Sequence, residues 1–224
     1  MKTTQRILTT AAVLLLLATA TGCSTANKAE TATSSAATAT DSALKTANVP
    51  APGAAVSGWP GVKQVHSPGV VAMDEQLTSC KAQVLDAAKG DYLPDPSCTP
   101  GAIDPAVTQD NIDSTVCKSG YSSTVRPPAS DTDKFKAISL RAYGEPTEST
   151  IELDHLVSLE LGGTNSASNL WPEMNHVGAT GTTNPKDAVE NTLHKAVCDH
   201  KVKLADAQNA IARNWTTALK DLGL

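Results

Sequence analysis

Four cysteines are the strongest constraint on how this chain can fold: Cys80, Cys98, Cys117 and Cys198. They follow an N-terminal segment that predicts export, and an even number of cysteines in an oxidising compartment indicates disulfides. Three pairings are open, and we favour Cys80–Cys98 with Cys117–Cys198. Zinc binding is the alternative, but the chain has no Cys-x-x-Cys pair. Two disulfides would stabilise a small core, since aromatic residues make up only 3% of the chain.

Residues 1–22 have the organisation of a signal peptide of the lipoprotein type. Lys2 and Arg6 form a basic start, Ala11–Ala20 is apolar, and small residues precede Cys23. The apolar stretch is too short for a membrane-spanning helix. We therefore expect Cys23 to be lipidated and to become the mature N-terminus. Secretion without a lipid is the alternative, because Ala stands at the third position before Cys23, where Leu is more usual.

Residues 23–57 are dominated by Ala, Thr and Ser and contain no aromatic residue, which predicts a disordered tether. Residues 58–224 have the length of a single domain, with a monomer as the default. The chain has 18 basic and 23 acidic residues; four basic and two acidic ones precede Lys63, so 14 and 21 remain and the folded part is acidic. Because non-specific nucleic-acid binders usually carry a basic face, any such binding here requires a local patch.

Local patterns predict an α+β domain that is mainly helical. Asn184 and Pro185 are typical of a helix start, and glycines are typical of helix ends. The expected helices cover Met73–Lys89, Thr108–Val116, a segment from Ser130 or Thr132 to Ala142, Pro185–Val197 and Leu204–Leu222. A strand is expected over Tyr121–Val125, before two prolines. The last helix is expected to bury Leu204, Ala207, Ile211, Trp215 and Leu222.

The segment Ile151–Glu173, with the sequence IELDHLVSLELGGTNSASNLWPE, carries the clearest functional signal. Asp154 and His155 end a strand-like run, a Gly-Gly turn follows, and Asn169 opens a second apolar run. A neutral imidazole suits the role of a general base, and a neighbouring carboxylate can hold a divalent cation. An amide such as Asn169 can fix the histidine ring without adding charge. These roles predict His155 as the base, Asp154 as a metal ligand and Asn169 as the orienting amide.

This order of acid–His, Gly-Gly loop and Asn-Leu-aromatic resembles the hairpin of HNH nucleases. The segments that begin at Cys98, Thr115 and Val125, and those over Lys186–Cys198 and Ala207–Trp215, look like a group of bacterial exported HNH-related proteins. The resemblance implies a ββα-metal core at about residues 148–198, stapled by disulfides. It also implies a divalent metal ion, with Mg²⁺ favoured over Mn²⁺ or Zn²⁺.

In that family a helix after the hairpin completes the site, and here several residues compete for the role. Asp187, Glu190, Asn191 and His194 share one stripe of the expected helix. We favour Asp187 or Glu190 as metal ligands, because hard cations prefer oxygen. Glu173 and His176 in the preceding loop are further candidates.

Three functions are compatible with these patterns. The first is a metal-dependent nuclease that hydrolyses DNA or RNA, with Arg126 and Lys186 as the basic residues expected to contact phosphate. The chain would be exported and held at the outer face of a bacterial membrane through Cys23, or secreted. The alternative is a non-catalytic exported scaffold that binds a surface or envelope partner; a hydrolase of another phosphoester is a weaker third hypothesis.

Overall fold

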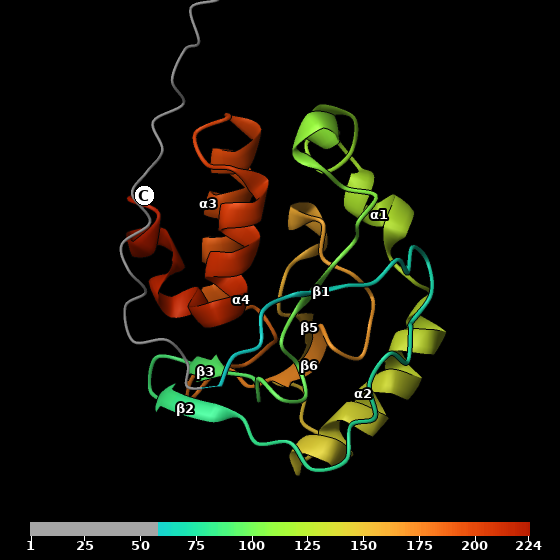
Figure 1. Ribbon diagram of the computed structural model, residues 1–224. Coiled ribbons are helices and arrows are strands. Elements are labelled where there is room, and N and C mark those ends of the chain that lie inside the picture. Colours follow the sequence, from blue (N-terminus) through green and yellow to red (C-terminus); the bar gives the residue numbers. More distant parts are fainter. Residues whose placement is uncertain (1–57) are drawn as a thin grey trace, which may run out of the picture. The chain divides into compact units, whose positions relative to one another are not determined.

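The computed structural model describes residues 58–224 as a mixture of helices and small two-stranded sheets, joined by two disulfides (Figure 1). The fold is therefore α+β, as expected. The segments predicted to be a signal peptide and a tether, with Cys23, lie outside the described residues. In chain order the elements are β1 Lys63–Gln64, β2 Gln83–Asp86, β3 Asp91–Leu93, β4 Ala102–Ile103, the 3₁₀ helix η1 Gln109–Ser114, α1 Tyr121–Val125, α2 Ala129–Tyr143, β5 Glu152–His155, the 3₁₀ helix η2 Leu159–Leu161, β6 Leu170–Glu173, α3 Pro185–Cys198 and α4 Leu204–Asp221.

The antiparallel pair β5–β6 lies at the centre, with α2 on one side and α3 and α4 on the other (Figure 1). In its register Asp154 is opposite Trp171 and His155 is opposite Leu170. Trp171 is fully buried and packs near Tyr143, with 6.5 Å between the ring centroids. The hairpin is thereby held in the core, and its end with Asp154 and His155 is fixed from both sides.

Helix α3 begins where the sequence predicts. The Asn184 side chain accepts from the backbone N–H of Lys186, and the Asp187 side chain accepts from the backbone N–H of Asn184. These reciprocal bonds satisfy N–H groups that a helix start otherwise leaves without partners. Pro185 at the first helical position has no N–H to satisfy. These bonds fix the backbone of the first turn of α3, which carries Lys186 and Asp187.

Helix α4 covers α3 and closes the core. The five residues expected to be buried along it, from Leu204 to Leu222, are all buried. The helix is interrupted at Asn214, whose φ of −163° and ψ of 95° are not helical. Its side chain accepts from the backbone N–H of Thr216, so Asn214 caps the second half of the helix.

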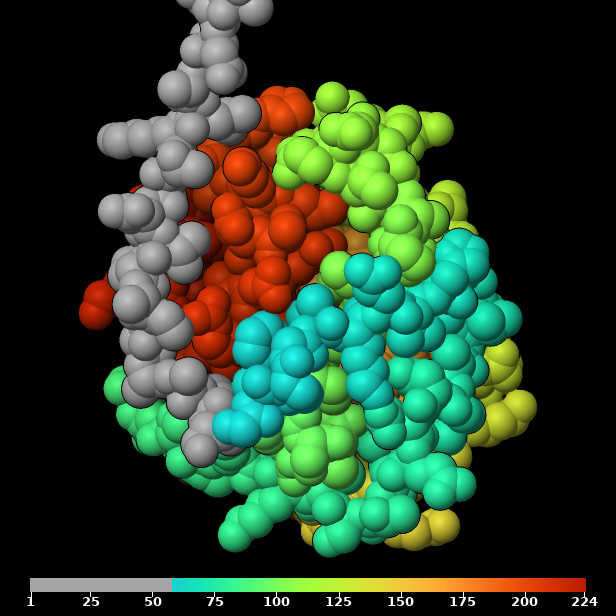
Figure 2. Space-filling view, viewed as in Figure 1, coloured from blue at the N-terminus to red at the C-terminus, as the bar shows by residue number. Residues whose placement is uncertain are grey.

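The first described segment, residues 59–80, crosses the face seen in Figure 2. Its backbone donates to carbonyl groups far along the chain: from Lys63 to Gly101, from Gly69 to Val125 and from Ala72 to Asn165. We call this segment the N-terminal strap. These hydrogen bonds join it to the loop before β4, to the end of α1 and to the loop between β5 and β6.

Two of the expected elements are wrong. Met73–Lys89 contains strand β2 and a turn instead of a helix, because long-range contacts hold it extended: Cys80 is bonded to Cys98, and its backbone donates to Ala142. Tyr121–Val125 is the short helix α1 instead of a strand. The expected helix over Thr108–Val116 is confirmed only as the 3₁₀ helix η1.

Both favoured disulfide pairings are confirmed. Cys80 is bonded to Cys98 across 18 residues and Cys117 to Cys198 across 81 residues, with Cα–Cα distances of 6.0 and 5.5 Å. The first joins the strap to the loop before β4, and the second joins the end of α3 to the loop after η1. Within residues 58–224, no helix has both the length and the apolar character needed to cross a membrane.

Candidate functional site

Asp154 and His155, adjacent at the end of β5, point to different partners. Successive side chains of a strand project to opposite faces. Asp154 Oδ2 lies 2.5 Å from Lys186 Nζ, whereas His155 Nε2 lies 2.9 Å from Asn165 Oδ1. The hairpin thus presents two neighbouring sites, which we call half-sites. In the first, His155 faces the loop between β5 and β6; in the second, Asp154 faces α3.

The hydrogen bonds of Asn165 determine which nitrogen of His155 carries a proton. Asn165 Nδ2 donates to Ser67 O at 2.9 Å and to Val125 O at 2.8 Å. Both amide hydrogens are used, so Oδ1 accepts and His155 Nε2 donates. Nδ1 of His155 then carries the lone pair, and no residue in the described part of the chain is hydrogen-bonded to it.

The environment of His155 favours the neutral ring. Burial is the main cause that lowers the pKa of His155 to about 4; Asp154 and Asn165 act in the opposite direction, and Arg126 and Lys186 lower it further. A neutral imidazole with an available lone pair is in the state that a general base requires. At this pKa the base is always deprotonated near neutral pH, but it takes up a proton less readily than one with a pKa near 7.

Asn169 has a different role from the one expected. Its Nδ2 donates to Val157 O and Thr164 O, and its Oδ1 accepts from the backbone N–H groups of Ala102 and Val157. The expectation that Asn169 orients the ring of His155 is therefore wrong, because Asn165 makes that contact. Asn169 instead cross-links the loop between β5 and β6 and joins it to β4.

The Gly-Gly turn follows from the tight packing of this loop. A Cβ atom on Gly163 would lie 1.7 Å from Val157 O, so no other residue fits there. Gly162 adopts a φ of 76°, which strongly favours glycine. The glycines therefore permit the loop that brings Asn165 to His155.

Lys186, in the first turn of α3, lies at the centre of the second half-site. Its side chain is 1% exposed, and Nζ donates to Asp154 Oδ2, to the backbone O of His155 at 2.8 Å and to Glu190 Oε1. Glu173 Oε2 is 4.0 Å from the same nitrogen. We call Lys186, Asp154, Glu173 and Glu190 the Lys186 cluster.

The charges of this cluster are strongly interdependent. Burial favours the neutral amine, yet Asp154, Glu190 and Glu173 together raise the pKa of Lys186 well above its ordinary value. Burial is the largest single influence on Asp154 and acts to raise its pKa, but Lys186, Glu173 and His155 together keep that pKa below its usual value. For Glu190, burial raises the pKa to about 8 despite Lys186. Asp154 and Lys186 are therefore the firmly charged pair.

Glu173 is the least satisfied member of the cluster. It is 1% exposed, and neither carboxyl oxygen has a hydrogen-bond acceptor or donor partner assigned among the described residues. Burial raises its pKa well above the usual value; Lys186 opposes this, and Asp154 adds to it. The neutral acid is therefore favoured.

Two surface pockets adjoin the half-sites. A pocket of about 250 Å³ is lined by Arg126, Lys136, Glu152 and His155, among others. A second pocket of about 470 Å³ is lined by Arg126 together with the acidic residues Glu160, Asp187 and Glu190 and with Asn191. Arg126 is exposed and lines both pockets, so it is placed to meet an anion beside His155.

The other helix candidates do not converge on Asp154. Asp187 caps α3, and the Asn191 side chain donates to the backbone of Asp187. His194 is one turn further along α3, next to a disulfide. His176 is exposed, and Nδ1 of its ring lies 3.1 Å from the neighbouring Val177 O. Of the expected third residues, the structure brings Glu190 and Glu173 to the cluster.

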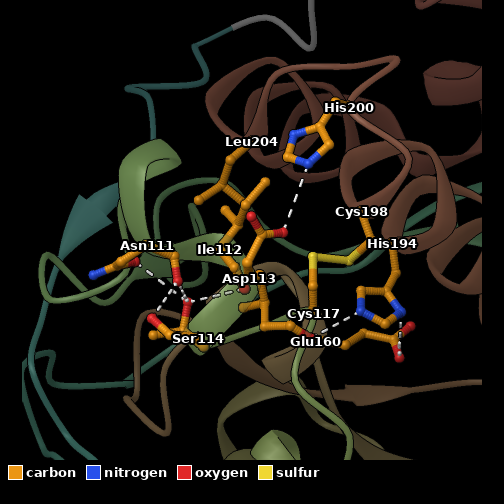
Figure 3. The surroundings of a disulfide bond; sticks show 12 residues. Asn111, Ile112, Asp113, Ser114, Cys117, Glu160, His194, Cys198, His200 and Leu204 are labelled. Carbon is orange, nitrogen blue, oxygen red and sulfur yellow. Dashed lines mark hydrogen bonds and ion pairs between the residues drawn. A yellow bond between two sulfur atoms is a disulfide. The ribbon is translucent and has the colours of Figure 1, made fainter.

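A separate group of metal-ligating atoms lies at the other end of α3 (Figure 3). The ligand atoms of Cys117, His194 and Cys198 are all within 4.8 Å of one another, which makes them a group that could hold a metal ion. The two sulfur atoms are bonded to each other in this structure. His194 Nε2 is 2.9 Å from Val116 O, and Nδ1 is 3.5 Å from Glu160 Oε2. The group is therefore available to a metal only after reduction.

Sequence reasoning missed two features of the site. Asn165 was not singled out, although it lies in the polar run between the glycines and Asn169; the run itself was the available signal. Lys186 was expected to contact phosphate, but it is buried and all three of its N–H groups have partners, so it does not face a ligand. Comparison of the chain with known protein families, curated proteins and solved structures finds no match.

Proposed function

We propose that the protein hydrolyses phosphodiester bonds of DNA or RNA at the end of the β5–β6 hairpin, with His155 as general base. The observation that carries this proposal is the state of His155: a neutral ring, held through Nε2 by Asn165, with the Nδ1 lone pair free and Arg126 in the adjoining pocket. The order of hairpin, Gly-Gly loop and following helix supports an HNH-like core, as the sequence resemblance implies.

In the proposed reaction, Nδ1 of His155 takes a proton from a water molecule as its oxygen attacks phosphorus. The P–O bond to the leaving oxygen breaks, and that oxygen takes a proton from solvent. The Arg126 guanidinium balances the charge of the phosphate, for which its planar donors are well suited. Asn165 holds the tautomer and the orientation of the ring.

The resemblance also implies a divalent metal ion. The types of residue in the Lys186 cluster fit such an ion, but their arrangement does not. The donor set of Asp154, Glu190 and Glu173 has the oxygen chemistry of a magnesium site. The position where these carboxylates converge, however, is taken by the Lys186 ammonium. With Lys186 in place the cluster does not fit a metal ion, so no step of the proposed reaction is assigned to one.

Export and attachment through Cys23 belong to the same proposal, because two disulfides are typical of proteins that fold in an oxidising compartment. Nucleic acid is then a substrate met outside the cell. The acidic composition remains compatible with this proposal only through the local positive charge of Arg126 and Lys136. A non-catalytic scaffold is the second candidate, favoured by the internal pairing of the expected metal ligands.

The test is cleavage of plasmid DNA and of single-stranded RNA by the purified, oxidised protein. His155→Ala is expected to lower the cleavage rate by about 10²–10⁴-fold, the usual contribution of a general base. His176→Ala is the matched control, since that ring is exposed and lines neither pocket. If the wild-type protein cleaves neither substrate, or if His155→Ala cleaves as well as the control, the scaffold becomes the better proposal.

A further inference from the structure

The Lys186 cluster has the coordination chemistry of a cation site. Two carboxylate oxygens and one backbone carbonyl oxygen surround a single positive charge, and a third carboxylate lies 4.0 Å away. Oxygen atoms of these kinds are the ligands that hard divalent cations take in proteins. Here the same oxygens are bound by an ammonium group that belongs to the chain.

The ammonium is fully used at this position. An ammonium group has three N–H donors, and Nζ of Lys186 has three partners: Asp154, Glu190 and the backbone O of His155. No donor is left for a substrate, and the side chain is 1% exposed. Lys186 therefore acts on the two carboxylates and on the end of β5, and does not reach a ligand itself.

Displacement of the ammonium would be costly. The backbone of Lys186 is fixed by the Asn184 cap in the first turn of α3, so the side chain can leave only by rotation out of a packed interior. Removing one partner of a buried ion pair leaves an uncompensated charge, which is strongly unfavourable. A divalent ion would have to overcome this cost before it gained any ligand.

We propose that Lys186 is a built-in replacement for the divalent ion of this site. As a positioning residue, it holds Asp154 and Glu190 around its own single charge, so the cluster binds no divalent cation and the chemistry beside it is metal-independent. The charge of the substrate phosphate is then met by Arg126. The spacing of the cluster agrees with this: in the described part of the chain, the carboxylates around Lys186 do not form a group whose ligand atoms all lie within 4.8 Å.

The experiment measures Mn²⁺ binding by electron paramagnetic resonance on the oxidised full chain. Wild-type protein is compared with Asp154→Asn, Glu190→Gln and Lys186→Met. Methionine keeps most of the length of lysine and removes its charge, which frees three carboxylates around one position. The wild-type protein is expected to bind no Mn²⁺ that depends on Asp154 or Glu190, and Lys186→Met is expected to bind one Mn²⁺ at least about tenfold more tightly than the wild type.

The proposal is overturned if the wild-type protein binds one Mn²⁺ and both Asp154→Asn and Glu190→Gln abolish that binding. It is also overturned if Lys186→Met folds and gains no affinity for Mn²⁺. If Lys186→Met does not fold without the ion, Mn²⁺ binding by the wild type is compared with that by Asp154→Asn and Glu190→Gln. Equal binding in these three proteins supports the proposal, and loss of binding in both variants overturns it. Mn²⁺ that binds equally to the wild type, Asp154→Asn and Glu190→Gln lies at another position, and a further Mn²⁺ gained by Lys186→Met then supports the proposal.

Only the statement about metal-independent chemistry rests on the proposed nuclease function. For it, cleavage by the wild-type protein is measured in EDTA and in Mg²⁺, and equal rates are expected. Rates that disappear in EDTA overturn the metal-independent step. Absence of cleavage in both solutions contradicts the nuclease function but leaves the Mn²⁺ result, which needs no activity, to decide the role of Lys186.

Discussion

A set of potential metal ligands lies near each end of helix α3, and the two sets are kept from a metal in different ways. At the first turn, an ammonium binds the carboxylates of the Lys186 cluster through hydrogen bonds and charge. At the last turn, a covalent bond joins the sulfurs of Cys117 and Cys198 beside His194 (Figure 3). The first set is blocked by the ammonium of Lys186. The second is blocked by the disulfide, which means by the oxidation state of Cys117 and Cys198.

The difference shows what is needed to open each set. Only a change of sequence removes the charge of Lys186, since its pKa lies well above the ordinary value. A dithiol reductant opens the second set without any substitution. Ligand types counted in a sequence are therefore poor evidence of a metal site until their existing partners are known.

The largest effect is expected from loss of the disulfide at the end of α3. The double variant Cys117→Ala, Cys198→Ala removes a cross-link over 81 residues and should lower the free energy of unfolding by about 4.5 kcal/mol. Loss of Cys80–Cys98, which spans 18 residues, should cost about 3 kcal/mol. Urea unfolding of the two double variants checks this order, and the reverse order would contradict it.

A somewhat smaller effect is expected in the Lys186 cluster. Asp154→Asn removes one charge from a buried ion pair and should lower the free energy of unfolding by about 3 kcal/mol. Asp131→Asn is the matched control, because Asp131 pairs with Lys134 on the surface at 3.5 Å and should contribute at most about 1 kcal/mol. Equal losses in the two variants would mean that the buried pair contributes no more than a solvated one.

The smallest effect is expected from zinc added to the reduced protein. With both sulfurs free, Cys117, His194 and Cys198 can supply three ligands, and Zn²⁺ should raise the melting temperature. His194→Ala should weaken binding about tenfold, which is about 1.4 kcal/mol. Calorimetric titration of zinc into reduced protein measures the affinity. An unchanged affinity in His194→Ala would show that the histidine is only a neighbour of the disulfide.

The features that could be predicted from the sequence are those set by local chemistry. The start of α3 follows from Asn184 and Pro185, and β5 ends at Asp154 and His155 as the apolar run before the polar loop indicates. The disulfide pairing was one of three possibilities, and the favoured one is confirmed. In each case the deciding residues are close in the sequence or are limited to a few combinations.

The features that could not be predicted depend on partners far along the chain. Asn165, rather than Asn169, contacts His155 because the carbonyl groups of Ser67 and Val125, 98 and 40 residues away, orient its amide. Lys186 is buried because Asp154, 32 residues earlier, meets it across the core. No local pattern contains these distances. The metal expected at Asp187 or Glu190 was a hypothesis about residue types; in the structure Asp187 caps α3, and Glu190 is paired with the ammonium of Lys186.

The N-terminal strap gives the candidate site a dependence on how the domain is trimmed. Ser67, in the strap, accepts one of the two hydrogen bonds that orient the amide of Asn165, and this amide in turn fixes the tautomer of His155. A protease that cut within the strap, between Ser67 and Cys80, would release Ser67 while leaving the disulfides Cys117–Cys198 and Cys80–Cys98 intact and sparing the core helices. Asn165 would nevertheless lose one of the two hydrogen bonds that orient its amide, and with it part of what holds the His155 ring. A cut near the start of the domain would therefore affect the hairpin before the core.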